Sequence, residues 1–183
     1  MKLNNLPNKK YNIILADPAW NYEKSGGIKS SRGLAKKFYD TMSTDEIKNI
    51  DIDSISKDNC YCFMWTTSPK LPESLEVMDS WGFEYFNVVF TWIKTNRVSN
   101  SLFWGMGNTT RANAEYVLLG RKGKLDRINA GVHSVIMSKI EKHSKKPNEV
   151  RERIVELYGD LPRIELFARD KTDGWDSWGN EID

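Results

Sequence analysis

Six short apolar runs rich in β-forming residues recur along the chain, and signals for helices fall between them. The runs cover residues 11–16, 60–66, 86–93, 115–120, 132–137 and 163–168. Each run has a length typical of a buried strand. Strands that alternate with helices predict an α/β fold, in which a mostly parallel sheet carries helices on both faces.

Three helices are predicted from the residues at their ends. Ser43 followed by Glu46 forms a capping box, which is typical of a helix start. Pro72 suits the first turn of a helix that ends near Gly82. The third helix follows Pro147 and has an apolar stripe of Val150, Ile154, Leu157 and Tyr158, which Gly159 ends.

Length and cysteine content limit the class of protein. The 183 residues suffice for a full core without disulfide or metal support, which predicts one domain over residues 1–183. Cys60 and Cys62 would share one strand face, reduced and buried. No four-ligand spacing joins them to the two His residues, so no metal site is predicted. The polar start and the absence of a long apolar run predict a soluble, cytoplasmic protein.

Charge and aromatic content favour a nucleic-acid partner only mildly. The chain has seven Trp residues, whose flat side chains serve both cores and stacked bases. Its net charge of +2 is too small to indicate a polyanionic partner. Residues 139–153 contain six Lys and Arg but three Glu, a pattern that by itself is typical of a solvated helix face.

Two glycine-containing stretches, residues 21–37 and 97–111, interrupt the strand and helix pattern. The first follows the run 11–16 and the second follows the run 86–93. Ligands of open α/β sheets bind beyond the carboxyl ends of strands, so both stretches are predicted to form mobile walls of a site. The sequence contains neither a dinucleotide fingerprint nor a phosphate-binding GxxxxGK[ST] motif. Nicotinamide and nucleoside-triphosphate chemistry are therefore disfavoured.

The segment Asp17-Pro18-Ala19-Trp20 places a carboxylate at the predicted carboxyl end of the first strand. Asp-Pro alone is a common turn signal. Trp20 adds an aromatic ring, so the segment offers a carboxylate, a carbonyl and a stacking surface, which together can hold an amino-bearing heterocycle. Adenine's exocyclic amine is a poor nucleophile because its lone pair is delocalised. Acceptors on both amine hydrogens, the Asp17 carboxylate and the Pro18 carbonyl, would localise that pair, while Trp20 stacks the base.

An ordered set of sequence blocks makes this interpretation specific. The blocks are LADPAWNY, FYDTMSTDEI, FMWTTS, FTWIKTN, RANAEYVLLGRKGK, EKHSKKPNEVRERI, RIELFAR and WDSWGNEI. Over nearly its whole length the chain resembles the adenine-N(6) methyltransferase family that includes the catalytic subunit of eukaryotic mRNA adenosine methyltransferase. It is most similar to the short bacterial and phage DNA adenine methyltransferases. The resemblance implies a Rossmann-like methyltransferase fold of permuted order, in which the catalytic motif precedes the cofactor strand.

The resemblance also implies a role for individual residues and S-adenosyl-L-methionine as the cofactor. The catalytic motif is implied to be Asp17, Pro18, Ala19 and Trp20, with Ala19 where the family has a second proline. Residues implied to bind the acceptor base are Tyr39, Asn113 and Glu115. Residues implied to bind the cofactor are Lys146, Leu166, Phe167, Arg169, Asn180 and Glu181.

Three alternatives follow for the activity. The first is methylation of adenine N(6) in DNA, which the short form favours and which would take place in a bacterial or phage-infected cell. The second is the same reaction on RNA, because the site residues contact only the base. The third is a catalytically silent nucleic-acid-binding subunit, against which the retained Asp17 and Trp20 argue. A second copy or a partner subunit is expected to help hold a duplex with a flipped base.

Overall fold

A computed structural model describes residues 5–22, 41–107, 109–141, 144–180 and 182. Its strands and helices follow in the order β1 (Tyr11–Ala16), α1 (Thr44–Lys48), η2 (Ile52–Ile55), β2 (Ser56–Thr66), η3 (Ser68–Lys70), α2 (Leu71–Ser80), β3 (Glu84–Thr95), β4 (Ala114–Lys122), β5 (Val135–Lys139), α3 (Glu149–Tyr158), β6 (Arg163–Leu166) and β7 (Asp176–Trp178). Strands and helices therefore alternate, as the sequence predicts.

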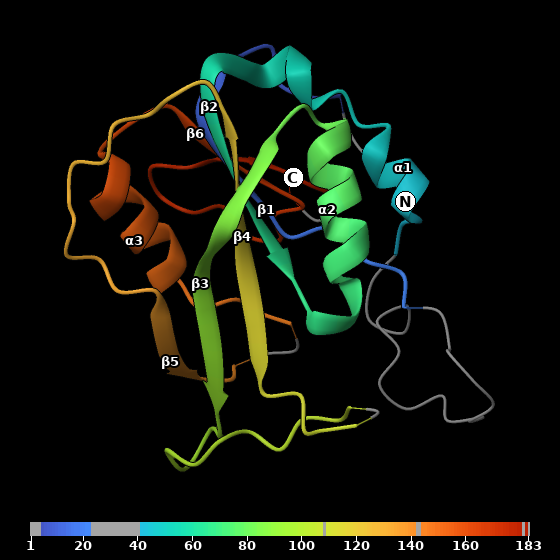
Figure 1. The fold of residues 1–183 in the computed structure, drawn as a ribbon, viewed down its shortest axis with the longest axis vertical. Coiled ribbons are helices and arrows are strands. Elements are labelled where there is room, and N and C mark those ends of the chain that lie inside the picture. Colours follow the sequence, from blue (N-terminus) through green and yellow to red (C-terminus); the bar gives the residue numbers. More distant parts are fainter. Residues whose placement is uncertain (1–4, 23–40, 108, 142–143, 181, 183) are drawn as a thin grey trace.

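The seven strands form one sheet in the order β5-β3-β4-β2-β1-β6-β7 (Figure 1). Four neighbouring pairs are parallel, namely β1 with β2, β1 with β6, β6 with β7 and β3 with β5. Only β4 runs against its neighbours β2 and β3 among the described strands. The prediction of a mostly parallel sheet is confirmed, and the reversed strand β4 brings its amino end to the edge where the parallel strands end.

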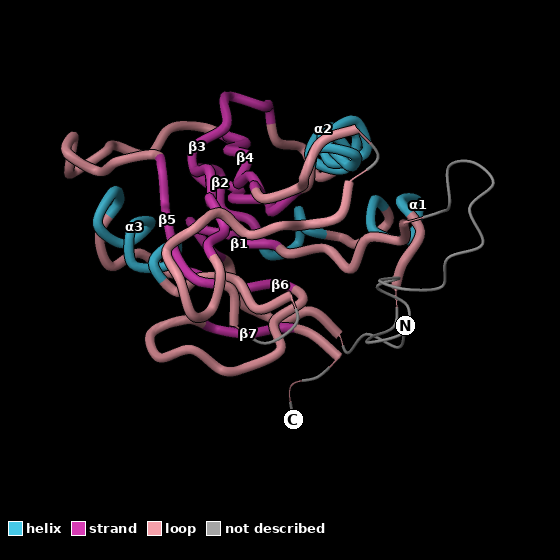
Figure 2. The backbone as a smooth tube through the Cα atoms, turned by 90° about the horizontal axis from the view of Figure 1, so that it is seen from below, coloured by secondary structure: helices cyan, strands magenta, loops and turns pink. Residues whose placement is uncertain are grey.

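Helices cover both faces of the sheet, as predicted (Figure 2). On one face Ile47 of α1 and Val77 and Met78 of α2 join a buried cluster with β1 and β2. On the other face the apolar stripe of α3, represented by Val150 and Ile154, packs against the opposite side of the same strands. Because β1 is covered on both faces, its side chains from position 13 to position 16 are almost completely buried.

The predicted helix ends are confirmed by backbone and side-chain contacts. Ser43 and Glu46 form a reciprocal capping box at the start of α1. Helix α2 has Pro72 in its first turn and is followed by Gly82. Helix α3 ends at Gly159, whose φ of 80° lies in the left-handed region that glycine adopts without strain.

The boundaries of the last strands differ from the prediction for identifiable reasons. Strand β5 begins at Val135 rather than at 132, because its parallel pairing with β3 starts at Thr91. Strand β6 stops at Leu166, since Phe167 takes a φ of 59° that an extended strand does not allow. Strand β7 was not predicted, because three residues of mixed polarity are too short to show a periodic pattern.

The two cysteines occupy one face of β2, as predicted, and both are reduced and buried. Burial raises the pKa of the Cys60 thiol to about 12 and the pKa of the Cys62 thiol well above its ordinary value. In the part of the chain that the structure describes, no three His, Cys, Asp or Glu side chains cluster as a metal site would require. No described helix is long and apolar enough to cross a membrane.

We predict that Gly120→Ala destabilises the packing of α2 on the sheet. A Cβ atom at this position of β4 would lie 2.6 Å from Sδ of Met78 and 2.9 Å from Cβ of Phe83. Relieving this overlap should lower the free energy of unfolding by about 1–3 kcal/mol in urea denaturation. Gly131→Ala is the control, because its Cβ would meet only the Asn129 side chain. Equal stability of the Gly120→Ala variant and the unsubstituted protein would contradict the packing described.

Candidate active site

Side chains from four strands meet at the edge of the sheet where the parallel strands end. Asp17 directly follows β1, and Trp65 lies next to the last residue of β2. Lys94 lies next to the last residue of β3. Glu115 is the second residue of β4 and reaches the same edge because β4 runs in the opposite direction. The topology thus gathers residues that are up to 98 positions apart in the sequence.

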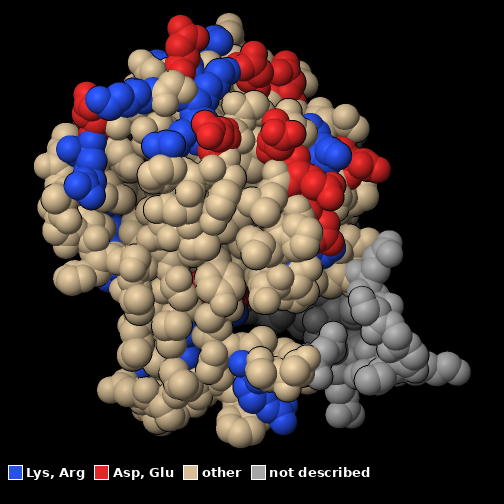
Figure 3. All heavy atoms as spheres, viewed as in Figure 1, with Lys and Arg blue, Asp and Glu red and all other residues tan. Residues whose placement is uncertain are grey.

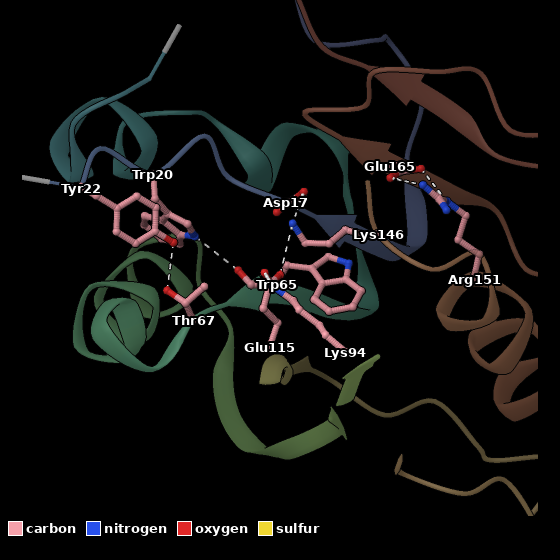
Figure 4. A network of polar contacts seen from close by, with 10 residues as sticks. All are labelled: Asp17, Trp20, Tyr22, Trp65, Thr67, Lys94, Glu115, Lys146, Arg151 and Glu165. Carbon is pink, nitrogen blue, oxygen red and sulfur yellow. Dashed lines mark hydrogen bonds and ion pairs between the residues drawn. The ribbon is translucent and has the colours of Figure 1, made fainter. Parts of the chain in front are cut away.

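Two lysines and two carboxylates form a chain of alternating charge at this edge (Figure 4). Nζ of Lys146 lies 2.8 Å from Oδ2 of Asp17 and 3.4 Å from Oε2 of Glu115. Nζ of Lys94 donates a hydrogen bond to the other carboxylate oxygen of Glu115. We call these four residues the charge network. Their side chains are between 11% and 21% exposed, so water screens their interactions only in part.

The lysines keep the Glu115 carboxyl ionised despite its burial. Burial alone would raise the pKa of Glu115, but the nearby ammonium groups of Lys146 and Lys94 hold this pKa below its usual value. The network contains two cations and two anions and is therefore neutral. A neutral, hydrogen-bonded set is the arrangement in which buried charges cost the least free energy.

The Asp17-Pro18-Ala19-Trp20 motif forms a tight, largely buried turn at the end of β1. The backbone N–H of Trp20 donates to the carbonyl oxygen of Pro18 at 2.7 Å. A carbonyl oxygen has two lone pairs, so one remains for a ligand. The Trp20 indole is only 4% exposed, and its Nε1 donates to the backbone oxygen of Trp65 at 3.4 Å. A base can stack on Trp20 only if side chains that cover its ring move.

Sequence reasoning assigned no role to three polar residues of the site, namely Lys94, Tyr22 and Thr67. The Tyr22 hydroxyl lies 2.9 Å from Oγ1 of Thr67, which follows β2 (Figure 4). Burial is the main reason why the pKa of Tyr22 rises to about 12, and the carboxylates of Glu115 and Asp17 add to this rise. A usable signal was present, because each residue lies at or just beyond the end of a strand segment on the predicted binding edge.

The end of β6 adjoins the catalytic motif through the backbone. The N–H of Asp17 donates to the carbonyl oxygen of Leu166 at 3.4 Å. The next residue, Phe167, is buried with its ring against Trp178 at a centroid distance of 5.7 Å. Gly179 lies so close to Ala168 that an added Cβ would be 2.3 Å from the Ala168 carbonyl oxygen. The predicted cofactor segment 166–169 is therefore in contact with Asp17 at Leu166 and with Trp178 and Gly179, which precede the predicted cofactor residue Asn180.

The remaining predicted site residues differ in their placement. The carbonyl oxygen of Asn113 accepts a hydrogen bond from the backbone N–H of Lys94, which places Asn113 beside the charge network. Arg169 is half-buried after β6, and Asn180 is exposed after β7. Tyr39 and Glu181 lie outside the described residues.

Several described cations of the basic stretch 139–153 have carboxylate partners within the chain. Arg151 makes a bidentate ion pair with the buried Glu165 of β6, at 2.6 and 2.7 Å. Arg153 pairs with Glu149 at 2.6 Å, and Lys145 pairs with Glu141. Lys146, as described above, belongs to the charge network.

Residues 11–181 match the family model described as MT-A70. The chain therefore belongs to the MT-A70 family. Its similar proteins in this family are named as methyltransferases. The predicted Rossmann-like methyltransferase fold is confirmed.

The chain is similar to the type II methyltransferase M.MunI of Mycoplasma sp., with 36% identity over 97% of this chain and 80% of that protein. It is also similar to the human N(6)-adenosine-methyltransferase catalytic subunit METTL3, with 27% identity over 95% of this chain and 28% of that protein. The Drosophila melanogaster N(6)-adenosine-methyltransferase MT-A70-like protein is 27% identical over 95% of this chain and 27% of its own length. The chain thus spans about a quarter of the length of these animal relatives.

We predict that Glu115→Gln changes how stability depends on pH. The folded-state pKa of Glu115 lies below its usual value of 4.5, so the ionised carboxylate stabilises the fold above that pH. This contribution is lost as the pH falls below 4.5 and through the folded-state pKa. At pH 7 the substitution should lower the free energy of unfolding by about 1–3 kcal/mol, because two lysines then face Asp17 alone. The difference from the unsubstituted protein should shrink as the pH falls below 4.5 and through the folded-state pKa.

Urea denaturation at a series of pH values measures this difference. Asp126→Asn serves as the control, because the Asp126 side chain is 85% exposed and lies outside the charge network. A destabilisation by Glu115→Gln that is constant from neutral to acid pH would show that the charge of the Glu115 carboxylate does not add to the free energy of unfolding.

Proposed function

We propose that this protein transfers the methyl group of S-adenosyl-L-methionine to the exocyclic N(6) amine of adenine in DNA. Membership of the MT-A70 family supports methyl transfer, and the similarity to a bacterial type II methyltransferase supports DNA as the substrate. The cytoplasm of a bacterial or phage-infected cell is the proposed location.

The observation that carries this proposal is the pair of acceptors formed by Asp17 and Pro18. One oxygen of the Asp17 carboxylate pairs with Lys146, which leaves the second oxygen for an amine hydrogen. The remaining lone pair of the Pro18 carbonyl would accept the other amine hydrogen. Two acceptors localise the nitrogen lone pair and stabilise the positive charge that develops on the nitrogen as it bonds to the methyl carbon.

The residues beside Asp17 fit the proposed methyl donor. Lys146 provides a cation for the carboxylate of the donor, and the buried Leu166 and Phe167 provide an apolar wall next to Asp17. The exposed Asn180 amide can hydrogen-bond to ribose hydroxyls. When bound, S-adenosyl-L-methionine supplies an electrophilic methyl group. The chain's own residues orient the adenine amine, and we propose Glu115, Asn113 and Tyr39 as the further residues that contact the base, with Arg169 and Glu181 on the side of the donor.

RNA is the alternative substrate, because the human and fly relatives are named as N(6)-adenosine-methyltransferases. Nucleoside analysis of DNA and RNA from cells that express the protein tests both substrates. We expect N(6)-methyladenine in the DNA, and its absence in cells that express Asp17→Ala. Methylation confined to RNA would overturn DNA as the substrate. Absence of the modification from both nucleic acids would favour a silent subunit or a missing partner subunit.

Asp17→Asn should abolish most of the chemistry and leave donor binding largely intact. The amide has nearly the same size, but it lacks the charge and can turn a donor towards the adenine amine. By analogy with losing one preorganised electrostatic contact, methyl transfer should fall about a hundredfold or more. Single-turnover transfer of labelled methyl at saturating donor measures the chemical step, and calorimetry measures donor affinity. A variant that transfers methyl as fast as the unsubstituted protein would show that Asp17 is not catalytic and that the Asp17-Pro18-Ala19-Trp20 motif is only a turn.

A further inference from the structure

The connection between β3 and β4 forms a narrow projection that begins and ends in the candidate active site. Lys94 precedes it and Asn113 follows it, and the backbone of these two residues is hydrogen-bonded at 2.8 Å. Two further backbone hydrogen bonds link the first part of the projection to the end of β3. Phe103 N–H donates to Lys94 O, and Asn96 N–H donates to Ser101 O. We call residues 97–107 and 109–111 the β3–β4 projection. Figure 1 shows that it extends beyond the ends of both strands.

Two glycines allow the first and second halves of the projection to lie against each other. A Cβ at Gly105 would be 1.9 Å from the carbonyl oxygen of Ala112, and a Cβ at Gly107 would be 2.2 Å from that of Thr110. Side chains at these positions would push the two halves apart. The result is a thin element that presents its large side chains outward.

Large apolar side chains on the projection are exposed to solvent. Trp104 is 72% exposed and Met106 is 71% exposed, although side chains of this kind are normally buried. The Arg111 guanidinium lies 4.9 Å from the centroid of the Trp104 ring and stacks on it. Trp104 therefore presents a supported flat surface one residue after Phe103, whose N–H bonds to Lys94 of the charge network, whereas Trp20 is buried.

The positive charge of the projection favours a polyanionic partner over the apolar surface of another protein. Residues 96–112 contain Arg97 and Arg111 and no Asp or Glu. Ser, Thr and Asn make up most of its other polar residues, and these donate hydrogen bonds to phosphate oxygens readily. Among the described residues, Figure 3 shows basic but not acidic side chains on the projecting lower end of the visible face, whereas both kinds are mixed over its upper part.

We propose that the β3–β4 projection enters a groove of double-stranded DNA and that Trp104 occupies the space in the base stack from which the target adenine is withdrawn. This inference rests on the proposed function, because an adenine must leave the duplex before its amine can reach Asp17. Apolar wedges that unstack neighbouring bases are a known means of distorting a duplex. Here Arg111 backs the wedge, and the projection connects it directly to Lys94 and Glu115 at the active site.

Comparing duplex and single-stranded substrates tests the wedge. The probes are unmethylated double-stranded DNA and the same DNA kept single-stranded, and the readout is single-turnover transfer of labelled methyl. With duplex DNA, Trp104→Ala should lower the rate about tenfold or more, since the energy of one stacking contact is lost. With single-stranded DNA no base pair has to be opened, so the loss should be about threefold or less. Trp104→Phe should recover most of the duplex activity, because it keeps an aromatic face.

Phe86→Ala is a matched control at the other end of β3. Phe86 is 50% exposed, and the Arg121 guanidinium lies 3.5 Å from its ring centroid, so it reproduces the aromatic–arginine pair away from the active site. This variant should methylate both DNA forms at the rate of the unsubstituted protein.

Two outcomes would overturn the wedge. One is an unchanged duplex rate for Trp104→Ala, and the other is an equal loss of rate on both DNA forms. If the equal loss comes with a smaller assembly in sedimentation, the projection instead contacts a second protein chain. Failure of the unsubstituted protein to methylate either DNA form would instead overturn the proposed function, so the two failures are distinguishable.

Discussion

The ammonium group of Lys146 organises the binding edge of the sheet. It lies between the carboxylates of Asp17 and Glu115, which belong to segments far apart in the sequence. Without this cation the two carboxylates would face each other at the end of β1 with only Lys94 to compensate them. Opposite charges thus hold β1, β3, β4 and the segment after β5 together, and Lys146 fixes the Asp17 carboxylate at the end of β1.

Alternating apolar runs and helix-end residues were sufficient to predict the central part of the fold. Strand β1 was predicted with its observed bounds, and the capping box of Ser43 and Glu46 marked α1. These features depend on local chemistry that any window of the sequence contains. The reversed direction of β4, the late start of β5 and the short β7 depend on pairing between distant segments, which no local pattern records.

The candidate site was predicted unevenly for the same reason. Asp17, Glu115 and Lys146 carry charge in recognisable motifs, and the structure brings them into contact. Lys94 stood in an equally clear motif, but its role appears only when the antiparallel pairing places it beside Glu115. Trp20 shows the opposite case, because its residue type suggests an open stacking surface, whereas the fold buries its ring.

The two cysteines of β2 have a practical consequence for spectroscopy. The chain contains no other cysteine, both thiols are buried, and their raised pKa values leave little thiolate at neutral pH. A cysteine placed at an exposed position such as Val98, which is 95% exposed, would therefore react with a dye long before the native thiols. One substitution gives a singly labelled enzyme, so that its encounter with nucleic acid can be followed optically without first removing residues from the core.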